Sequence, residues 1–268
     1  MNTESLAKQI RLQALSMVHR ADASHIGGAL SMTDVLAVLY TEVMKVRPSE
    51  PAWPERDRFI LSKGHCCSAL YAALALQGFF PLEELQTFGA NGSRLMTHIS
   101  HKVPGVEFST GSLGHGLPFA CGKALSAKRR GQTWRVFAML SDGELDEGSN
   151  WEAILFAPHH RLDNLTLIID HNKIQSLGDV QDVLDLHPLA DKFRAFRWSV
   201  SEVDGHDHAA IRTAFSSLPA EPGSPTCIIA HTVKGKGVDY MEQRLLWHYR
   251  SPNAEQLAEA QRQIATCP

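Results

Sequence analysis

Two polar segments of this chain hold residue types that bind a hard divalent cation. The first is Ser141-Asp142-Gly143-Glu144-Leu145-Asp146-Glu147-Gly148, and the second contains Asn172, 30 positions after Asp142 (172 − 142). The Asp142 carboxylate, the Asn172 amide and the backbone carbonyl of Ile174 would form an all-oxygen ligand set, which suits Mg²⁺ together with phosphate oxygens. Gly143 leaves room for backbone N–H groups to approach a phosphate, and the N-terminus of the helix that follows favours anions.

A simpler interpretation is that Asp142 only caps a helix and Asn172 only occupies a turn, because Asp and Asn are common at such positions. We favour the metal site because each residue follows a predicted strand. Their two strand ends can be neighbours, with one helix returning between them.

Apolar segments predict the strands that position these residues. Four are clear and one is weaker, at residues 58–61, 136–140, 165–169, 227–230 and, less clearly, 198–203. Helical patterns are found at residues 4–20, 68–77, 147–158, 186–196 and 207–218. A further helix is expected to begin with Ser31 or Thr33 as its N-cap and to end at about residue 45. This alternation predicts an α/β fold, a doubly wound and mostly parallel sheet with helices on both faces. We expect one domain over residues 1–268, with a C-terminal extension from about residue 235 that wraps outward.

A distinctive polar segment follows each clear strand. These segments are residues 62–65, 141–148, 170–175 and 231–237. Ligands of such sheets bind at the carboxyl ends of the strands, so the segments are expected to form one site. The chain has 14 histidines, and several stand beside glycine or serine in these turns, which also indicates a polar site.

The bulk composition is that of a soluble globular protein. Hydrophobic residues make up 44% of the 268 residues. The formal charge of −3 shows no excess of basic residues of the kind that binds nucleic acid or an anionic membrane. We find no secretory signal and no apolar run long enough to span a bilayer. The five cysteines form no C-x-x-C pair, which predicts reduced thiols in a cytoplasmic protein; they are Cys66, Cys67, Cys121, Cys227 and Cys267.

The segment from Asp142 to Gly148 and the downstream Asn172 resemble the thiamine diphosphate motif, with Ser141 where a first glycine is usual. Five further segments resemble transketolases, at residues 24–28, 61–65, 105–116, 231–237 and 247–248. The resemblance covers nearly the whole chain, but only the first third to half of an ordinary transketolase. It implies the thiamine diphosphate-binding fold.

The resemblance also implies roles for the cofactor residues. Asp142, Asn172 and the Ile174 carbonyl would bind the metal, which would be Mg²⁺, or Ca²⁺ or Mn²⁺. Gly111 and Leu113 would line the thiamine diphosphate.

Four histidines and one glutamate would serve catalysis by the same resemblance. His65 and His248 would lie near the diphosphate and the reacting carbons. His25 and His98 would hydrogen-bond the sugar hydroxyls, and Glu147 would belong to a charge network between paired sites. Histidine suits this chemistry because an imidazole can donate and accept protons near neutral pH.

Several positions stay open at this stage. His101 is three residues from His98 and could take its role. His115 replaces a usual glutamine and could be a polar neighbour with no special role. Lys234 and Lys236 could grip a phosphate or could belong to a solvated loop.

The resemblance implies the N-terminal subunit of a two-chain transketolase. Such a transferase moves a two-carbon ketol unit from a ketose, a phosphate or related sugar, to an aldose. It would be active only with a partner, a C-terminal subunit that carries the pyrimidine-binding domain, in a heterotetramer of two copies of each chain. The alternatives are a thiamine diphosphate-dependent 2-oxo acid decarboxylase or dehydrogenase component, a non-catalytic regulatory subunit, and more distantly an NAD-binding domain.

Overall fold

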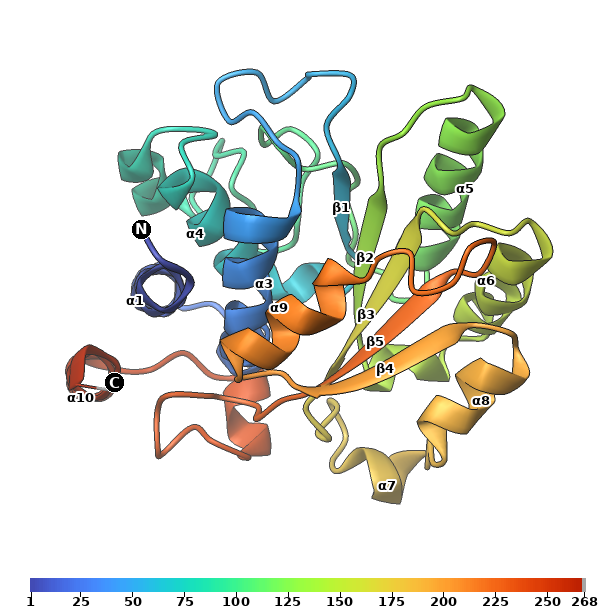
Figure 1. Ribbon diagram of the computed structural model, residues 1–268. Coiled ribbons are helices and arrows are strands. Elements are labelled where there is room, and N and C mark those ends of the chain that lie inside the picture. The colour runs from blue at the N-terminus through green and yellow to red at the C-terminus, as the bar shows by residue number, and fades with distance from the viewer. Residues whose placement is uncertain (267–268) are drawn as a thin grey trace.

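The fold is built on a five-stranded parallel sheet (Figure 1). The computed structural model describes residues 1–266 of the chain. Its strands lie in the order β1-β2-β3-β5-β4. They are β1 (Arg58–Leu61), β2 (Val136–Ser141), β3 (Leu165–His171), β4 (Ser199–Asp204) and β5 (Thr226–His231). Strands β2, β3 and β5 are unbroken buried runs, whose successive side chains point to opposite faces of the sheet. Ile168 packs into one helical layer and Leu167 into the other. The predicted α/β fold is therefore confirmed.

Helices cover both faces of this sheet (Figure 1). One layer contains α1 (Thr3–Arg20), α2 (Ile26–Ser31), α3 (Thr33–Val38), α4 (Cys67–Leu76) and α9 (His208–Ser216). The other contains α5 (Gly116–Arg129), α6 (Gly148–His159), α7 (Val180–Val183) and α8 (Leu189–Ala195). After β4 the chain turns back to place β5 beside β3, so the right-handed crossover puts α9 on the face opposite α8. The sheet is thus doubly wound.

Short helical turns complete the chain. A π-helical turn spans Leu39–Val43, and 3₁₀ turns span Gly64–Cys66, Leu82–Thr87, Gly143–Asp146 and Leu245–His248. Three of these 3₁₀ turns contain predicted site residues.

The expected N-cap at Ser31 or Thr33 is wrong. The helical segment begins at Ile26, and Met32 separates α2 from α3. Both hydroxyls donate instead of accepting, Thr33 to the Ala29 carbonyl and Ser31 to the carboxylate of Asp170. The buried carboxylate competes for the hydroxyl that would otherwise cap the helix.

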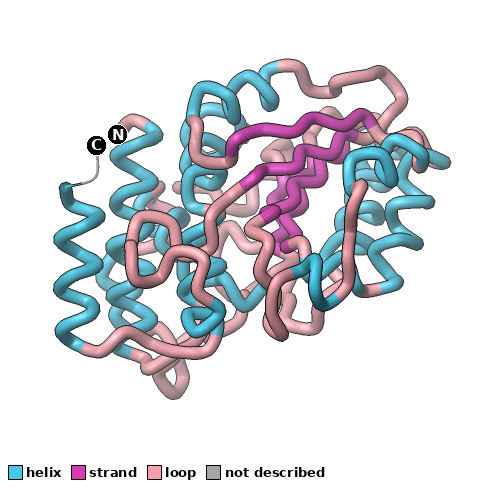
Figure 2. The backbone as a smooth tube through the Cα atoms, turned by 90° about the horizontal axis from the view of Figure 1, so that it is seen from below, coloured by secondary structure: helices cyan, strands magenta, loops and turns pink. Residues whose placement is uncertain are grey.

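The C-terminal extension crosses the carboxyl edge of the sheet and ends in α10 (Ala254–Thr266). Helix α10 lies against the outer side of α1, and Figure 2 shows these two helices side by side at one end of the molecule. Ala260 and Ile264 are buried, and Lys8 donates to the Ala265 carbonyl.

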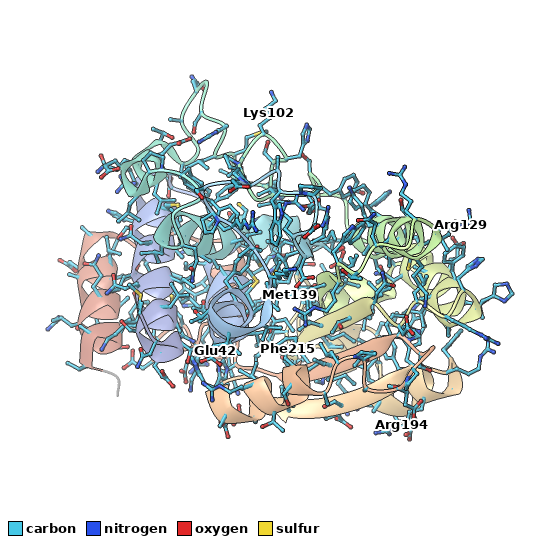
Figure 3. All side chains as sticks on the ribbon, turned by 45° about the horizontal axis from the view of Figure 1, so that its top comes forward. Glu42, Lys102, Arg129, Met139, Arg194 and Phe215 are labelled. Carbon is cyan, nitrogen blue, oxygen red and sulfur yellow. The ribbon has the colours of Figure 1, made fainter. Side chains whose placement is uncertain are left out.

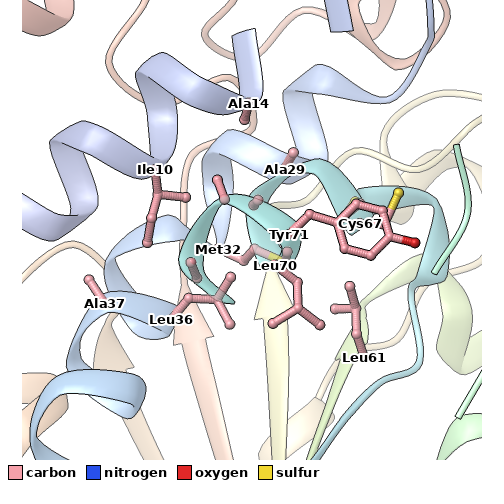
Figure 4. Close-up of a cluster of buried hydrophobic side chains, with 14 of the residues drawn as sticks. Ile10, Ala14, Ala29, Met32, Leu36, Ala37, Leu61, Cys67, Leu70 and Tyr71 are labelled. Carbon is pink, nitrogen blue, oxygen red and sulfur yellow. The ribbon is translucent and has the colours of Figure 1, made fainter. Parts of the chain in front are cut away.

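The core beneath the site is built from α1, α3 and α4 (Figure 4). Ile10, Leu36 and Leu70 fill it, and small residues such as Ala29 let the helices approach closely. Tyr71 connects the core to the site, because its hydroxyl donates to the His98 carbonyl at 3.2 Å. Charged side chains such as Lys102, Arg129 and Arg194 point outward at the rim, while Met139 and Phe215 lie inside (Figure 3).

The four described cysteines, Cys66, Cys67, Cys121 and Cys227, are buried and unbridged. Cys267 lies outside the described residues. In the part of the chain that the structure describes, no helix is both long enough and apolar enough to cross a membrane.

Replacing Ile168 by Ala in the central strand should lower the free energy of unfolding by about 2–5 kcal/mol, because the side chain is fully buried and its loss leaves a cavity. The matched control is Leu155→Ala on α6, whose side chain is 57% exposed and whose loss should change stability by less than about 0.5 kcal/mol. Urea unfolding of the isolated chain measures both. Equal losses would contradict the assigned core.

Candidate functional site

A cavity of about 350 Å³ opens at the carboxyl ends of the strands, and every predicted site residue lines it. The sequence separation of these residues reaches 223 positions (248 − 25). Parallel strands end at the same edge of the sheet, so the turns that follow them converge there. The predicted residues in the lining are His25, His65, His98, Gly111, Leu113, Asp142, Gly143, Glu147, Asn172, Ile174 and His248.

The predicted metal ligands stand on two turns that are tied to each other. Asp142 follows β2 and Asn172 follows β3, and these strands pair in register. The buried Asp142 carboxylate accepts the backbone N–H of Gly143 at 2.8 Å and that of Lys173 at 2.6 Å. The Asn172 side-chain oxygen accepts the N–H of Ile174 at 3.2 Å. Carboxylate, amide and carbonyl oxygens thus come from one small region.

The lining residues fit a metal-bound diphosphate. The predicted set has one carboxylate, that of Asp142, beside the Asn172 amide and the Ile174 carbonyl, and it leaves positions for phosphate oxygens. A Cβ atom at Gly143 would lie 2.5 Å from the Cβ of Gln175, so only glycine permits this close approach of the two turns.

Lys234 is a site residue whose role the sequence left open. It is only 2% exposed, and its ammonium group donates to the Ile174 carbonyl at 2.7 Å and lies 3.2 Å from His248 Nδ1. Burial lowers the pKa of Lys234 to about 8. The solvated-loop interpretation is therefore wrong for Lys234. Lys236 lines a different cavity, with its ammonium group 3.8 Å from Glu242.

Four imidazoles form a cluster beside these oxygens. The ring centroid of His25 lies 5.0 Å from those of His65 and His248 and 5.7 Å from that of His98. The backbone N–H of His25 donates to the backbone carbonyl of His248 at 2.9 Å, and the backbone of His25 is left-handed, with φ 74°. The strained turn therefore aims one imidazole at the other three.

Burial keeps these imidazoles neutral. It lowers the pKa of His25 to about 4 and that of His248 to about 3. It also holds the pKa of His65 well below its ordinary value, and it lowers the pKa of His98. A neutral imidazole has one nitrogen that donates and one that accepts, so the cluster can both give and take hydrogen bonds at neutral pH.

The positions of His98 and His101 differ. His98 lines the cavity, whereas His101 is exposed and its Nδ1 lies 2.7 Å from the Ser109 hydroxyl. The geometry favours His98 as the residue that faces a substrate, and a substrate contact stays a prediction. His115 is exposed, with Nδ1 3.0 Å from the Leu113 carbonyl.

Sequence reasoning missed the buried ion pair of Lys63 and Asp170. Lys63 is 1% exposed, and its ammonium group contacts the Asp170 carboxylate and donates to the Gly28 carbonyl at 3.1 Å. Asp170 also accepts from Ser31 and Thr232. Burial opposes ionisation of Asp170, but Lys63 still lowers its pKa. A lysine directly after a buried strand was the available signal, because such a charge needs a partner.

Sequence reasoning also missed Glu144. This buried carboxylate accepts from the Ser62 hydroxyl and from the Gly114 N–H at 3.0 Å, and burial raises its pKa. It thereby fastens the glycine-rich turn to the end of β1. Glu147 instead is exposed at the N-terminus of α6, and its charge network stays a prediction.

A comparison with protein families matches residues 2–266 of this chain to the family described as transketolase, thiamine diphosphate binding domain. The chain is 41% identical over 262 residues to an apulose-4-phosphate transketolase subunit of Phocaeicola vulgatus, covering 98% of this chain and 93% of that protein. It is 43% identical over 243 residues to a 6-deoxy-6-sulfo-D-fructose transketolase subunit of Clostridium sp. (strain MSTE9), covering 90% of this chain and 88% of that protein.

Solved structures agree. The transketolase from Campylobacter jejuni superposes with a TM-score of 0.93 at 32% identity, over 99% of this chain and 43% of that one. The transketolase from Leishmania mexicana gives a TM-score of 0.92 at 31% identity, over 99% of this chain and 41% of that one. This chain therefore spans about two-fifths of these solved transketolases.

Acidification should reduce stability through the histidine cluster. His25 and His248 have lowered pKa values in the folded chain, so below about pH 6.5 the unfolded chain binds protons that the folded chain does not. Their contribution to stability is present above that pH and is lost as the pH falls toward about 4. Urea unfolding at pH 7 and pH 5 should show a smaller loss for the double variant His25→Asn, His248→Asn than for the wild type. His159→Asn, at an exposed position on α6, should behave as the wild type. Equal losses in all three proteins would refute the effect.

Proposed function

Since this chain belongs to the transketolase family, we propose that it is the N-terminal subunit of a two-chain transketolase, which transfers a two-carbon ketol unit from a ketose to an aldose. The observation that carries the proposal is one cavity lined both by the oxygen-bearing residues Asp142, Asn172 and Ile174 and by four imidazoles that burial keeps neutral. The first arrangement suits a metal-bound diphosphate, and the second suits proton transfer at sugar oxygens.

We assign cofactor binding to the strand-end turns. Asp142, Asn172 and the Ile174 carbonyl would hold Mg²⁺, and an all-oxygen set also suits Ca²⁺ or Mn²⁺. The ammonium group of Lys234, now on the Ile174 carbonyl, would turn to a diphosphate oxygen, and His65 lines the same cavity. When bound, thiamine diphosphate supplies the carbanion chemistry, while the protein positions groups and stabilises charge.

The imidazoles would act on the substrate. His25 and His98 would donate to sugar hydroxyls and to an oxyanion that develops beside them, which lowers the barrier to its formation. His65 and His248 would hold or move protons near the diphosphate and the reacting carbons. Their buried, neutral state supports this, because a neutral imidazole can accept a proton that a charged one cannot.

A second chain would complete the site. Two relatives that this chain matches over nearly their full length are named as transketolase subunits. The solved transketolases are more than twice as long as this chain. The partner would supply the pyrimidine-binding domain, in a heterotetramer with two copies of each chain. Leu155 and Phe156 are exposed on α6, the helix that begins after Glu147, and they support a docking surface on this helix. We expect a cytoplasmic protein.

The substrate is proposed only as a class. The named relatives act on apulose 4-phosphate and on 6-deoxy-6-sulfo-D-fructose. For this chain we propose a ketose donor that is a sugar phosphate or a related sugar, with an aldehyde acceptor.

Reconstitution tests the function. The chain should copurify with the product of a neighbouring reading frame that carries a pyrimidine-binding domain. With thiamine diphosphate and Mg²⁺, the pair should transfer a ketol unit from a panel of ketoses and should not decarboxylate 2-oxo acids. Decarboxylation without ketol transfer would replace the proposal by a 2-oxo acid decarboxylase component. Cofactor binding with neither reaction would favour a regulatory subunit.

His65→Ala and His248→Ala should each lower turnover of the reconstituted pair about 10²–10⁴-fold, the range expected when a proton-transfer group is lost. The melting temperature of each variant should stay close to that of the wild type. Thr213→Ala, at an exposed position on α9 in the other helical layer, should keep the wild-type rate. Unchanged rates in both test variants would refute the catalytic assignment.

His98→Ala and His101→Ala form a second matched pair. The His98 variant should lower kcat/KM for the ketose by about tenfold or more, because a substrate hydrogen bond is lost. The exposed His101 should have little effect. The reverse order would place His101 at the substrate.

A further inference from the structure

A hydrogen-bonded relay outside the cavity ends on the loop that carries Lys234. It starts at Arg11 on α1, whose guanidinium group donates to both oxygens of Asp34 on α3, at 2.9 and 2.5 Å. Asp34 is 5% exposed, and Arg11 and two histidines surround its carboxylate. Such a carboxylate is held in one orientation and can orient the groups that bind it.

His206 is the next member of the relay. It lies in the turn between β4 and α9, and its Nδ1 is 2.7 Å from Oδ2 of Asp34. The backbone N–H of Val233 donates to its Nε2 at 2.9 Å. Since Nε2 accepts a hydrogen bond, it carries no proton, and the proton is on Nδ1 and is donated to Asp34. The contacts on both sides therefore select one tautomer.

The loop that donates this bond is also held at its neighbouring residues. The Gln243 N–H donates to the Lys234 carbonyl at 2.8 Å, and the Lys236 N–H donates to the Val233 carbonyl at 3.1 Å. Thr232 donates its hydroxyl to Asp170, and the Gly235 N–H donates to the Gly27 carbonyl at 2.9 Å. Val233 stands between these anchors, directly before Lys234. The His206 ring accepts the Val233 N–H and so fixes the peptide just before the residue pair Val233–Lys234, while the Gln243 N–H fixes the chain on the other side of Lys234.

We propose that His206 is a positioning residue, which holds the Val233 amide so that the loop presents the buried Lys234 side chain to the site cavity. The hold acts between residues 206 and 233 of this chain and requires no cofactor. Only its consequence for diphosphate binding rests on the proposed function.

His208 provides a matched control within the same cluster. Its Nε2 lies 3.2 Å from Oδ1 of Asp34, so it shares the carboxylate with His206. Its other ring nitrogen, Nδ1, is buried and has no hydrogen-bond partner among the described residues. His208 therefore contacts the relay but passes nothing to the Lys234 loop. A general role in packing around Asp34 would make both histidines equally important, whereas the proposed role singles out His206.

Two substitutions at position 206 separate the two contacts. In His206→Asn the short amide can still donate to Asp34, where Nδ1 was, but it does not reach Val233. In His206→Gln the longer amide oxygen can accept the Val233 N–H, where Nε2 was. The His206→Asn variant should therefore lose the hydrogen bond to the Val233 N–H and free the loop, whereas the His206→Gln variant should largely keep this bond. His208→Asn removes a bond to Asp34 without touching the loop.

The test uses the full chain without cofactor. Hydrogen exchange over residues 232–236 and acylation of Lys234 are both followed by mass spectrometry, with the exposed Lys102 as the internal reference for labelling. His206→Asn should speed both processes about fivefold to tenfold, as expected for loss of one hydrogen bond. His206→Gln should stay near the wild type, and His208→Asn should match the wild type. Wild-type exchange and labelling in His206→Asn, or equal acceleration in His208→Asn, would overturn the proposal.

A second measurement tests whether the relay affects cofactor binding. Calorimetry with the partner chain, thiamine diphosphate and Mg²⁺ should show a higher Kd for His206→Asn than for His208→Asn. A released loop with an unchanged Kd would leave the hold by His206 in place and refute Lys234 as a diphosphate ligand. An unreleased loop with normal cofactor binding would refute the hold alone and leave the proposed function intact.

Discussion

The buried ion pair of Lys63 and Asp170 is the contact on which the site depends. Lys63 follows β1, Asp170 ends β3, and the same carboxylate accepts from Ser31 at the end of α2 and from Thr232 after β5. Four segments that are distant in the sequence are thus joined at one point. Removing one partner of such a pair would leave an uncompensated charge in the interior, which typically costs about 3–5 kcal/mol. The turns that carry the site could not then keep their relative positions.

The same buried cations shape the electrostatics of the cavity. Burial is the main reason that the pKa values of His65 and His248 are low, and the positive charges of Lys63 and Lys234 add to it. Positive charge from fixed ammonium groups thus opposes positive charge on the imidazoles. Lys234 thus keeps a buried ammonium group in the cavity while the histidines stay neutral.

Local patterns were enough to predict the fold and the location of the polar turns after the strands, whereas the resemblance to transketolases supplied the roles of the histidines. Unbroken apolar runs marked the strands, and polar turns after them marked the edge of the sheet, so Asp142 and Asn172 could be placed together without a structure. The missed features are all long-range. Lys63 and Asp170 are 107 residues apart, and His206 and Asp34 are 172 apart. Ser31 has the residue type of an N-cap, but the distant Asp170 takes its hydroxyl. Sequence spacing does not say which buried charges will meet.

The left-handed backbone of His25 has a consequence for any attempt to make this protein more robust. A residue with a Cβ atom pays roughly 1–2 kcal/mol in that conformation, and glycine does not. Engineering for thermostability would therefore favour glycine at position 25, yet glycine would remove an imidazole from the centre of the cluster. The fold retains a locally unfavourable residue where its chemistry is proposed to occur, so heat resistance and turnover would be in direct conflict at this position.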